Sequence, residues 1–396
     1  MRRLEILDGM RGYFLVFMML NHLTFAGGYL LVKINHGELG YVQDAQGFVF
    51  LSGLLVGMVY TGRMKKQGYA AGAQKVRKRA FELYRYAIGS IATVVVLALL
   101  MKGSQTYWEP WLWELSQPDP VFAGAAALLL YQPTYMDILP QYILYLLVSP
   151  PLIWLCMTGR WRTVVAVSAL LWVAVQVGLD YPLGDGVRSF LAWLYDGDLF
   201  RTAFNIFAWQ VVFMSGLIIG ALTATGQIDW KKAMDPRRSV WAWTAFGGVL
   251  IFMAMRLGFT FNVMPEDMAK QVAGLDNRVD FSFIYLVNFI ATGYLVAWTI
   301  MAGPRSENAM VRTLGNGLSW LFSLSFLRLL GRHSLQVYTF HVILVYLLKV
   351  FEHHHGPFTE LGKTAIALAA VASLSIPALY RERKNFFGKR QAEAKA

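Results

Sequence analysis

The chain has 396 residues, of which 56% are hydrophobic and only 15% are charged, whereas soluble domains carry about 25% charged residues. This composition argues against a soluble cytosolic enzyme, and the 26 Phe, 19 Tyr and 13 Trp argue against a disordered chain. The single cysteine, Cys156, excludes an internal disulfide and a thiolate metal cluster. The net charge of +12 would be compatible with a nucleic-acid partner if the basic residues lay on a soluble surface. Their positions along the chain, described below, decide this point.

Apolar stretches long enough to cross a bilayer recur along the whole sequence. A spanning helix needs roughly 20 mostly apolar residues, and about ten stretches qualify: 10–32, 46–62, 80–101, 136–157, 162–179, 203–224, 240–258, 281–302, 333–352 and 360–380. We therefore predict an all-α, polytopic integral membrane protein with about ten transmembrane helices. Residues 1–396 are expected to form one membrane-integral domain that ends in a basic tail, 381–396. The first stretch is not expected to be a cleaved signal, because it is long and carries Arg11 and His22.

The basic residues are concentrated on alternate connections between these stretches. With a cytoplasmic N-terminus, 26 of the 36 Lys and Arg residues lie on cytoplasmic segments and eight lie on outward loops, which is the positive-inside pattern. Both termini are then expected to be cytoplasmic. The excess positive charge is thereby explained by the membrane, so the lipid bilayer is expected as a partner and nucleic acid is not. The outward loops 102–135, 180–202 and 259–280 are acidic and rich in aromatic residues at their edges.

The first predicted span carries two ionisable residues, Arg11 and His22. They are eleven positions apart, so at about 100° per residue they share one helix face, separated by a rise of about 16 Å. Ionisable groups inside a bilayer are costly and are therefore functional candidates. Arg11 at the cytoplasmic mouth suits an anionic donor, and His22 near mid-membrane suits proton transfer, because imidazole titrates near neutral pH. The alternatives are a positive-inside anchor and a hydrogen-bonded core histidine.

Two polar residues accompany this pair. Asp8 precedes Arg11 by three residues and is expected either to pair with it and orient its guanidinium or to serve only at the helix start. Asn21 lies about 100° round the helix from His22. It is assigned either to orienting a substrate or to helix packing.

The second and third spans add candidates for donor binding. Ser52 and Gly53 allow close backbone approach, and we interpret Ser52 as a packing or donor contact because no nucleophile elbow surrounds it. Arg79 and Arg85 lie on either side of the cytoplasmic start of the third span. Arginine forks bind phosphates in a bidentate manner, so a phosphate-rich donor such as coenzyme A is expected to meet them.

Polar residues in the outer halves of the fourth and sixth spans are candidates for binding an acceptor. They are Asp137, Gln141, Asn205 and Gln210. Each is expected to hydrogen-bond a sugar hydroxyl or an oxyanion, and each is equally compatible with helix packing.

The ninth span contains His341, also near mid-membrane, which is expected either to face His22 across the bundle interior or to make a packing hydrogen bond. The preceding region, 316–330, is apolar but contains Arg328, so it is expected to lie along the inner interface or to form an extra span. The adjacent histidines 353–355 cannot all point at one metal ion from a helix, and we expect no metal site.

Four stretches together resemble a known family. They are Leu7-Asp8-Gly9-Met10-Arg11-Gly12 with ten residues between Arg11 and His22, Phe48-Val49-Phe50-Leu51-Ser52-Gly53, the arginines of 79–85, and Gly331-Arg332-His333-Ser334-Leu335 leading to His341. This pattern resembles the membrane acyltransferase-3 superfamily and, within it, the OpgC family of succinyltransferases of osmoregulated periplasmic glucans. Asp137-Ile138-Leu139-Pro140 and the stretch from Phe204-Asn205 to Trp209-Gln210 look more like the OpgC branch.

The resemblance implies acyl transfer in the bacterial inner membrane, from a cytoplasmic acyl-CoA to hydroxyls of a periplasmic glucan. It implies that His22 is catalytic and that Arg11, Arg79 and Arg85 contact the donor. Succinyl-CoA is favoured as the co-substrate through the resemblance alone, and no tightly bound cofactor is implied.

The residues and the resemblance together lead to one mechanism with open alternatives. Neutral His22 is expected to take the proton from a glucan hydroxyl as it attacks the thioester, while Asn205, Gln210 or His341 steadies the oxyanion. A covalent acyl-His22 intermediate is the alternative mechanism. Alternative functions are O-acetylation of another periplasmic or surface glycan, and secondary transport of sugars or lipids, although the sequence repeats that favour a transporter are not evident.

Overall fold

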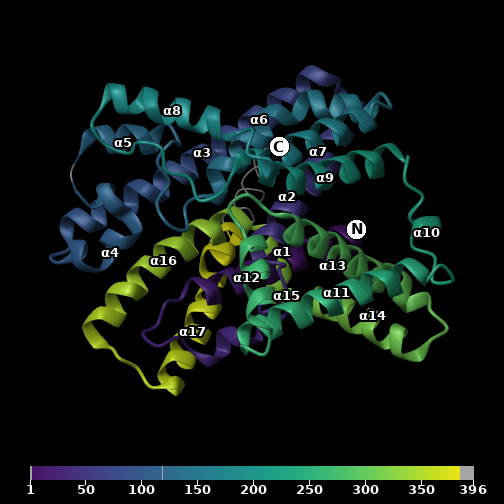
Figure 1. Ribbon diagram of the computed structural model, residues 1–396. Helices are drawn as coiled ribbons and strands as arrows, with labels where there is room; N and C mark the ends of the chain where they lie inside the picture. The colour runs from purple at the N-terminus through teal and green to yellow at the C-terminus, as the bar shows by residue number, and fades with distance from the viewer. Residues whose placement is uncertain (1, 118, 384–396) are drawn as a thin grey trace.

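The computed structural model describes residues 2–117 and 119–383, and within these residues the regular structure is helical (Figure 1). The nine longest helices in the described residues are α1 (Arg2–His22), α2 (Asp44–Gln67), α3 (Tyr69–Leu100), α6 (Ile138–Met157), α7 (Trp161–Gln176), α9 (Ile206–Thr225), α11 (Val240–Thr260), α13 (Phe283–Ala302) and α16 (Ser334–His355), and the last of these in the chain is followed by α17 (Glu360–Ser373). The short α-helices are α4 (Ser104–Leu112), α5 (Pro120–Ala127), α8 (Tyr181–Leu194), α10 (Trp230–Ala233), α12 (Glu266–Leu275), α14 (Ala309–Leu321) and α15 (Ser325–Arg332). Four 3-10 segments, η1 (Leu30–Ile34), η2 (His36–Leu39), η3 (Trp113–Ser116) and η4 (Gly303–Arg305), complete the described elements.

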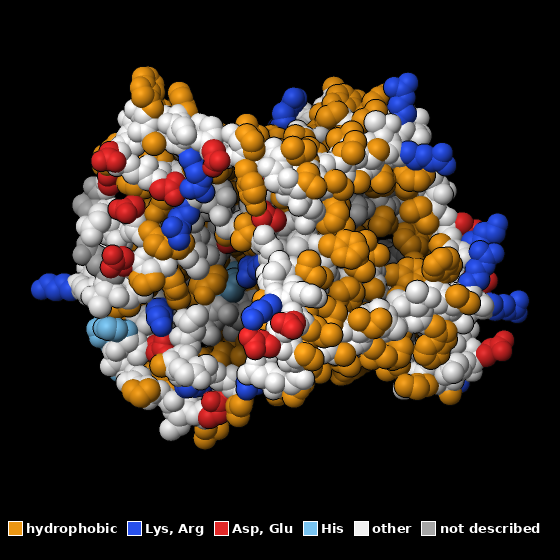
Figure 2. Space-filling model, viewed as in Figure 1, with side chains coloured by type: hydrophobic (Ala, Val, Ile, Leu, Met, Phe, Trp, Pro, Cys, Tyr) orange, Lys and Arg blue, Asp and Glu red, His pale blue; other side chains and the backbone are white. Residues whose placement is uncertain are grey.

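The all-α, multi-pass membrane architecture is confirmed. Among the described residues, eight helices are long and apolar enough to cross a bilayer, or nine if the pair α7 and α8, bent by 72°, is one span. The helix α1 is long enough, but its charged residues exclude it by that criterion. Large apolar side chains remain exposed on α7, α8 and α11, and Figure 2 shows them as a broad apolar surface over the bundle. The count of ten spans and the sides of the termini stay predictions.

The first predicted span, 10–32, is wrong at its outer end. The helix α1 ends at His22, and the chain then turns through Gly27 and Gly28, whose φ values of 74° and 70° end any helix. The side chain of Lys363 satisfies this irregular backbone by donating to the carbonyl oxygens of Ala26 and Gly28 at 2.7 Å each. His22 is therefore the last helical residue of α1, at the point where a regular helix gives way to a turn.

Other boundaries also differ from the sequence prediction. The helix α3 begins at Tyr69, well before the expected start at residue 80, and α8 occupies part of the expected outward loop 180–202. The apolar region 316–330 forms the end of α14 and most of α15, both too short to cross a bilayer. Of the predicted basic tail, residues 381–383 belong to the last helical stretch and the remainder lies outside the described residues.

Small residues bring α2 and α9 into close contact. A Cβ atom at Gly53 or Gly57 would collide with the backbone of α9, and one at Gly216 or Gly220 would collide with the backbone of α2. Both pairs are four residues apart, which is the small-residue spacing of closely packed membrane helices. The predicted close approach at Gly53 is thus confirmed.

Replacing Gly57 by alanine is expected to destabilise the protein, because the new methyl group would meet the carbonyl oxygen of Leu217. Overpacking of this kind costs about 1–3 kcal/mol. Gly62, on the same helix, has no described atom within 4 Å of its Cβ position, so Gly62→Ala is the matched control and should be neutral or slightly stabilising. Thermal unfolding of both variants in detergent checks this expectation, and equal melting temperatures would contradict it.

Candidate functional site

Two family-like stretches far apart in the sequence pack against one another around Arg11. A Cβ at Gly12 would collide with the backbone of Leu327 in α15, and one at Gly331 would collide with the backbone of Asp8 in α1. These glycines let α1 and α15 touch, and the chain then turns directly into α16. The guanidinium of Arg11 consequently donates to the hydroxyl of Ser334, the first residue of α16.

The same face of α1 meets α16 again at its outer end. His22 Nδ1 lies 3.0 Å from Nε2 of His341, which is fully buried. Arg11 and His22 therefore both face α16, as the eleven-residue spacing predicts. The predicted meeting of the two histidines across the bundle interior is also confirmed.

The hydrogen bonds of the two histidines determine which nitrogen atoms carry protons. His341 Nδ1 lies 2.6 Å from the carbonyl oxygen of Tyr338, and a carbonyl can only accept, so Nδ1 of His341 carries the proton. Nε2 of neutral His341 must then accept, and Nδ1 of His22 donates to it. This leaves Nε2 of His22 with a free lone pair, the arrangement required of a base.

Aromatic residues enclose His22. Its ring stacks on Tyr135, with 4.0 Å between the ring centroids. Tyr135 has a φ of 67°, an unusual backbone conformation for a non-glycine residue, and its carbonyl oxygen accepts a hydrogen bond from the hydroxyl of Tyr338 at 2.8 Å. Residues held in such a conformation are frequent at functional sites. No pattern in the sequence pointed to Tyr135.

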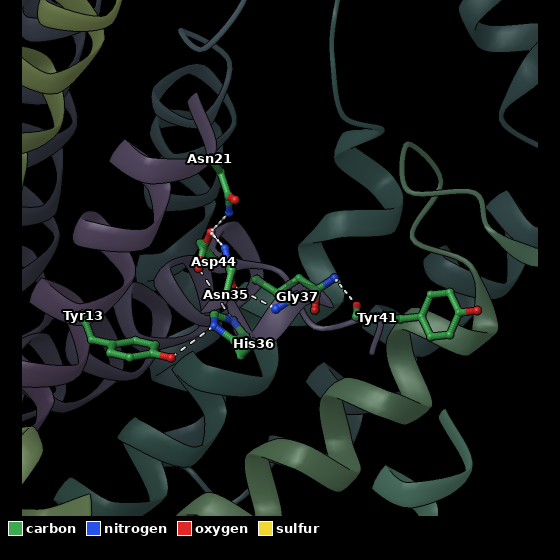
Figure 3. Close-up of polar contacts among 8 residues, drawn as sticks. Tyr13, Asn21, Asn35, His36, Gly37, Tyr41 and Asp44 are labelled. Atoms are coloured by element: carbon green, nitrogen blue, oxygen red, sulfur yellow. Dashed lines mark hydrogen bonds and ion pairs between the residues drawn. The ribbon is translucent and has the colours of Figure 1, made fainter. Parts of the chain in front are cut away.

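A second polar network lies beside the site and was missed by sequence reasoning (Figure 3). The buried carboxylate of Asp44, at the start of α2, accepts from the amide groups of Asn21 at 2.5 Å and Asn35 at 3.3 Å. His36 lies 3.6 Å from Asp44 on one side and 3.3 Å from the hydroxyl of Tyr13 on the other. Asn21 is therefore held by Asp44. Its predicted role in orienting a substrate stays a prediction.

The predicted donor residues fall into two groups. Arg11 and Arg79 interact electrostatically with each other and with the hydroxyl of Tyr142, so α1, α3 and α6 bring two cations together. Nε of Arg11 is buried and has no hydrogen-bond partner within the described residues. Arg85 is exposed on a different face of α3 from Arg79, and it lines a surface hollow with Arg77, Lys78 and Glu82, the carboxylate that pairs with Arg79. The reason is geometric, since six residues along a helix turn a side chain by about 120° relative to Arg79.

Asp8 and Arg11 attract one another electrostatically but form no close ion pair. No ion pair joins them among the residues that the structure describes, because Arg11 turns toward Ser334 instead. Arg79 pairs with Glu82 at 2.7 Å. Ser334 is therefore the hydrogen-bond partner of the Arg11 guanidinium, and the expected role of Asp8 in orienting it stays a prediction.

The predicted acceptor residues differ in whether other residues of the protein already occupy their hydrogen-bonding groups. Asn205 caps α9 and donates to Asp180 and Asp280 at 2.6 and 2.9 Å, and Gln210 bonds the hydroxyl and carbonyl of Ser168 at 2.7 Å each. Buried Gln141 and Ser52 each retain a polar atom, Nε2 and Oγ respectively, without a partner in the described part of the chain.

Asp137 differs from these residues in that it lies close to Tyr135, the residue that stacks on His22. It immediately precedes α6, two residues after Tyr135, and interacts electrostatically with Tyr338 and Arg278. Figure 2 shows a hollow on one face of the molecule, with a histidine side chain inside it and charged side chains around it.

Comparison with known proteins identifies the family of the chain. A family model described as OpgC protein matches residues 2–385. No curated protein and no solved structure matches the chain. Since the match covers nearly the whole sequence, including α1, α15 and α16, the protein belongs to the OpgC family and is a multi-pass membrane transferase.

Proposed function

We propose that this protein transfers a succinyl group from succinyl-CoA to hydroxyl groups of osmoregulated periplasmic glucans in the bacterial inner membrane. The observation that carries the proposal is the 3.0 Å contact between His22 Nδ1 and His341 Nε2, together with the 2.6 Å contact between His341 Nδ1 and the Tyr338 carbonyl oxygen. With these contacts, the Nε2 lone pair of His22 is free to take a proton. Family membership supports a transferase acting in glucan biosynthesis.

The donor is proposed to enter at the end of α1 that carries Arg11. Arg11 and Arg79 supply two positive charges for the phosphates of coenzyme A, and Nε of Arg11 is a buried donor that no other described residue uses. Along α1, Arg11 lies about 16 Å from His22. The extended pantetheine arm of the donor would cover this distance and place the thioester at the histidine.

The glucan is proposed to reach His22 from the opposite side. There the backbone turns after α1 and the segment with Tyr135 and Asp137 leads into α6. Aromatic rings and carboxylates are the groups that bind sugars, through stacking and through hydrogen bonds to hydroxyls. The acceptor and the donor then meet at one imidazole from two sides of the membrane.

In the proposed reaction the glucan hydroxyl oxygen attacks the thioester carbonyl carbon while His22 Nε2 takes the hydroxyl proton. The C–S bond then breaks, and His22 returns the proton to the departing sulfur. One ester and one free CoA thiol form, and His22 returns to its starting state. Positive charge that develops on His22 is stabilised through Nδ1 by the lone pair of His341.

The test is thioester consumption by the purified protein in detergent, with succinyl-CoA and acetyl-CoA offered separately, each with and without a periplasmic β-glucan. We expect release of free CoA that depends on the glucan and is faster with succinyl-CoA. Faster reaction with acetyl-CoA would identify an O-acetyltransferase. Labelled sugar crossing proteoliposomes without CoA release would show a transporter instead.

A further inference from the structure

An arginine on the connection between α12 and α13 lacks a carboxylate partner. Arg278 forms no ion pair within residues 2–117 and 119–383, although acidic residues lie two positions away on both sides. Asp276 pairs with Arg256 at 3.6 Å, and Asp280 accepts from Asn205 at 2.9 Å. Both neighbouring carboxylates are therefore engaged elsewhere, and the charge of Arg278 remains available.

The backbone holds Arg278 in a fixed place. Trp209 donates its indole N–H to the carbonyl oxygen of Arg278 at 3.0 Å, and the backbone N–H of Asn205 donates to the carbonyl of Val279 at 3.0 Å. The guanidinium carbon lies 5.2 Å from the ring centroid of Phe204, a cation–π arrangement that leaves the N–H groups free to bind an anion. The side chain is exposed rather than enclosed by the bundle.

Arg278 belongs to the surroundings of the histidine pair. The connection that carries it packs against the segment leading into α2: the hydroxyl of Tyr285 donates to Asp276 at 2.5 Å, and the ring of Tyr285 lies 5.7 Å from that of Tyr41, three residues before Asp44. Asp44 in turn holds Asn21, the neighbour of His22 in α1.

In agreement with this packing, the guanidinium of Arg278 interacts electrostatically with His22, Asp44 and Asp137. Arg11 and Arg79 belong instead to the cluster around Tyr142. Arg278 is thus the cation placed to act on a group that reacts at His22.

We propose that Arg278 binds the free carboxylate of the succinyl group while its thioester lies at His22, and so selects a dicarboxylic acyl donor over acetyl. This inference rests on the proposed acyl transfer. A succinyl group carries a carboxylate two methylene groups from the reacting carbonyl, and guanidinium binds carboxylate through two parallel hydrogen bonds. An acetyl group offers nothing to this cation.

The experiment compares Arg278→Gln with a matched control, Arg188→Gln. Arg188 also lies over a phenylalanine ring, 5.5 Å from the centroid of Phe200, but its charge is already paired with Asp198 at 3.1 Å. With a neutral β-glucan as acceptor, Arg278→Gln should lower kcat/KM for succinyl-CoA by about 10- to 100-fold, the usual cost of losing a charged hydrogen bond. Transfer from acetyl-CoA by the same variant, and both activities of Arg188→Gln, should stay within about twofold of the wild type.

Equal losses with both donors would overturn the proposal, since Arg278 would then act on the base, the acceptor or the fold. Unchanged succinyl transfer would also overturn it. A third contrary outcome is a loss of kcat/KM in Arg278→Gln that occurs only with a carboxylate-bearing acceptor, whichever donor is used. Arg278 would then bind the acceptor's carboxylate, and the proposal would be overturned.

Calorimetric binding of succinyl-CoA and acetyl-CoA without acceptor separates this inference from the proposed function. Tighter binding of succinyl-CoA that disappears in Arg278→Gln supports the carboxylate site, even if no acyl transfer is found and the proposed function fails. Equal binding of the two thioesters by the wild type and by Arg278→Gln overturns the site, even if acyl transfer is found.

Discussion

Replacing His22 by alanine is expected to abolish succinyl transfer while the protein stays folded and inserted in the membrane. The variant loses the Nε2 lone pair that takes the acceptor proton, and general base catalysis contributes about 10²- to 10⁴-fold to rate. The imidazole contributes little to packing beyond its contacts with Tyr135 and His341. Glucan-dependent release of free CoA from succinyl-CoA measures the loss.

The matched control is His354→Ala, which removes an exposed histidine from the last turn of α16 and should leave the rate unchanged. Thermal unfolding of both variants shows whether each is folded. A folded His22→Ala protein with the wild-type rate would remove the central residue of the proposed mechanism. Loss of activity in both variants would point to damage to α1 or α16 rather than to chemistry.

The features of the site that sequence reasoning predicted are those governed by helix periodicity. The positions of Arg11 and His22 on one helix face follow from their spacing in a regular helix, and α1 is regular from Arg2 to His22. Their partners Ser334 and His341 are seven residues apart, about two turns, and therefore share one face of α16. One face of α1 thus meets one face of α16. Regular helix geometry is therefore sufficient to predict that Arg11 and His22 lie on the same face.

The features that were missed depend on the tertiary structure. Asp44 meets Asn21 and His36 only because the chain turns after α1 and returns to start α2. Tyr135 stacks on His22 from a left-handed backbone conformation that its residue type disfavours. Arg278 could have been recognised as one of eight basic residues on the outward side, against the positive-inside pattern.

The glycines explain why the family-like stretches occur where they do. Gly9 accepts the backbone of Phe322 at the end of α14, Gly12 accepts the backbone of Leu327 in α15, and Gly331 of α15 accepts the backbone of α1. The sequence suggested only that the stretch around Arg11 supplies a cation. The structure adds that its glycines bring α1 and α15 together, which places Arg11 beside Ser334.

Replacing His341 by phenylalanine is expected to lower kcat for succinyl transfer by roughly 10- to 100-fold, the usual cost of leaving a buried donor without its hydrogen-bond partner. Phenylalanine keeps an aromatic ring in the buried site but cannot accept the Nδ1 proton of His22. The proton of His22 can then move to Nε2, and the imidazole no longer offers a lone pair to the acceptor hydroxyl. KM for succinyl-CoA should stay within about twofold, because Arg11 and Arg79 are untouched.

A glutamine at position 341 separates positioning from packing, because its carboxamide oxygen can accept from His22 Nδ1 as the imidazole of His341 does. His341→Gln should therefore retain more kcat than His341→Phe, although glutamine fits the buried site less well. If His341 only packed α16 against α1, His341→Phe would retain more kcat than His341→Gln. It would also raise KM, because a displaced α16 would move Ser334 away from Arg11. A fall in kcat at constant KM, partly restored by glutamine, thus requires that His341 act through the proton on His22.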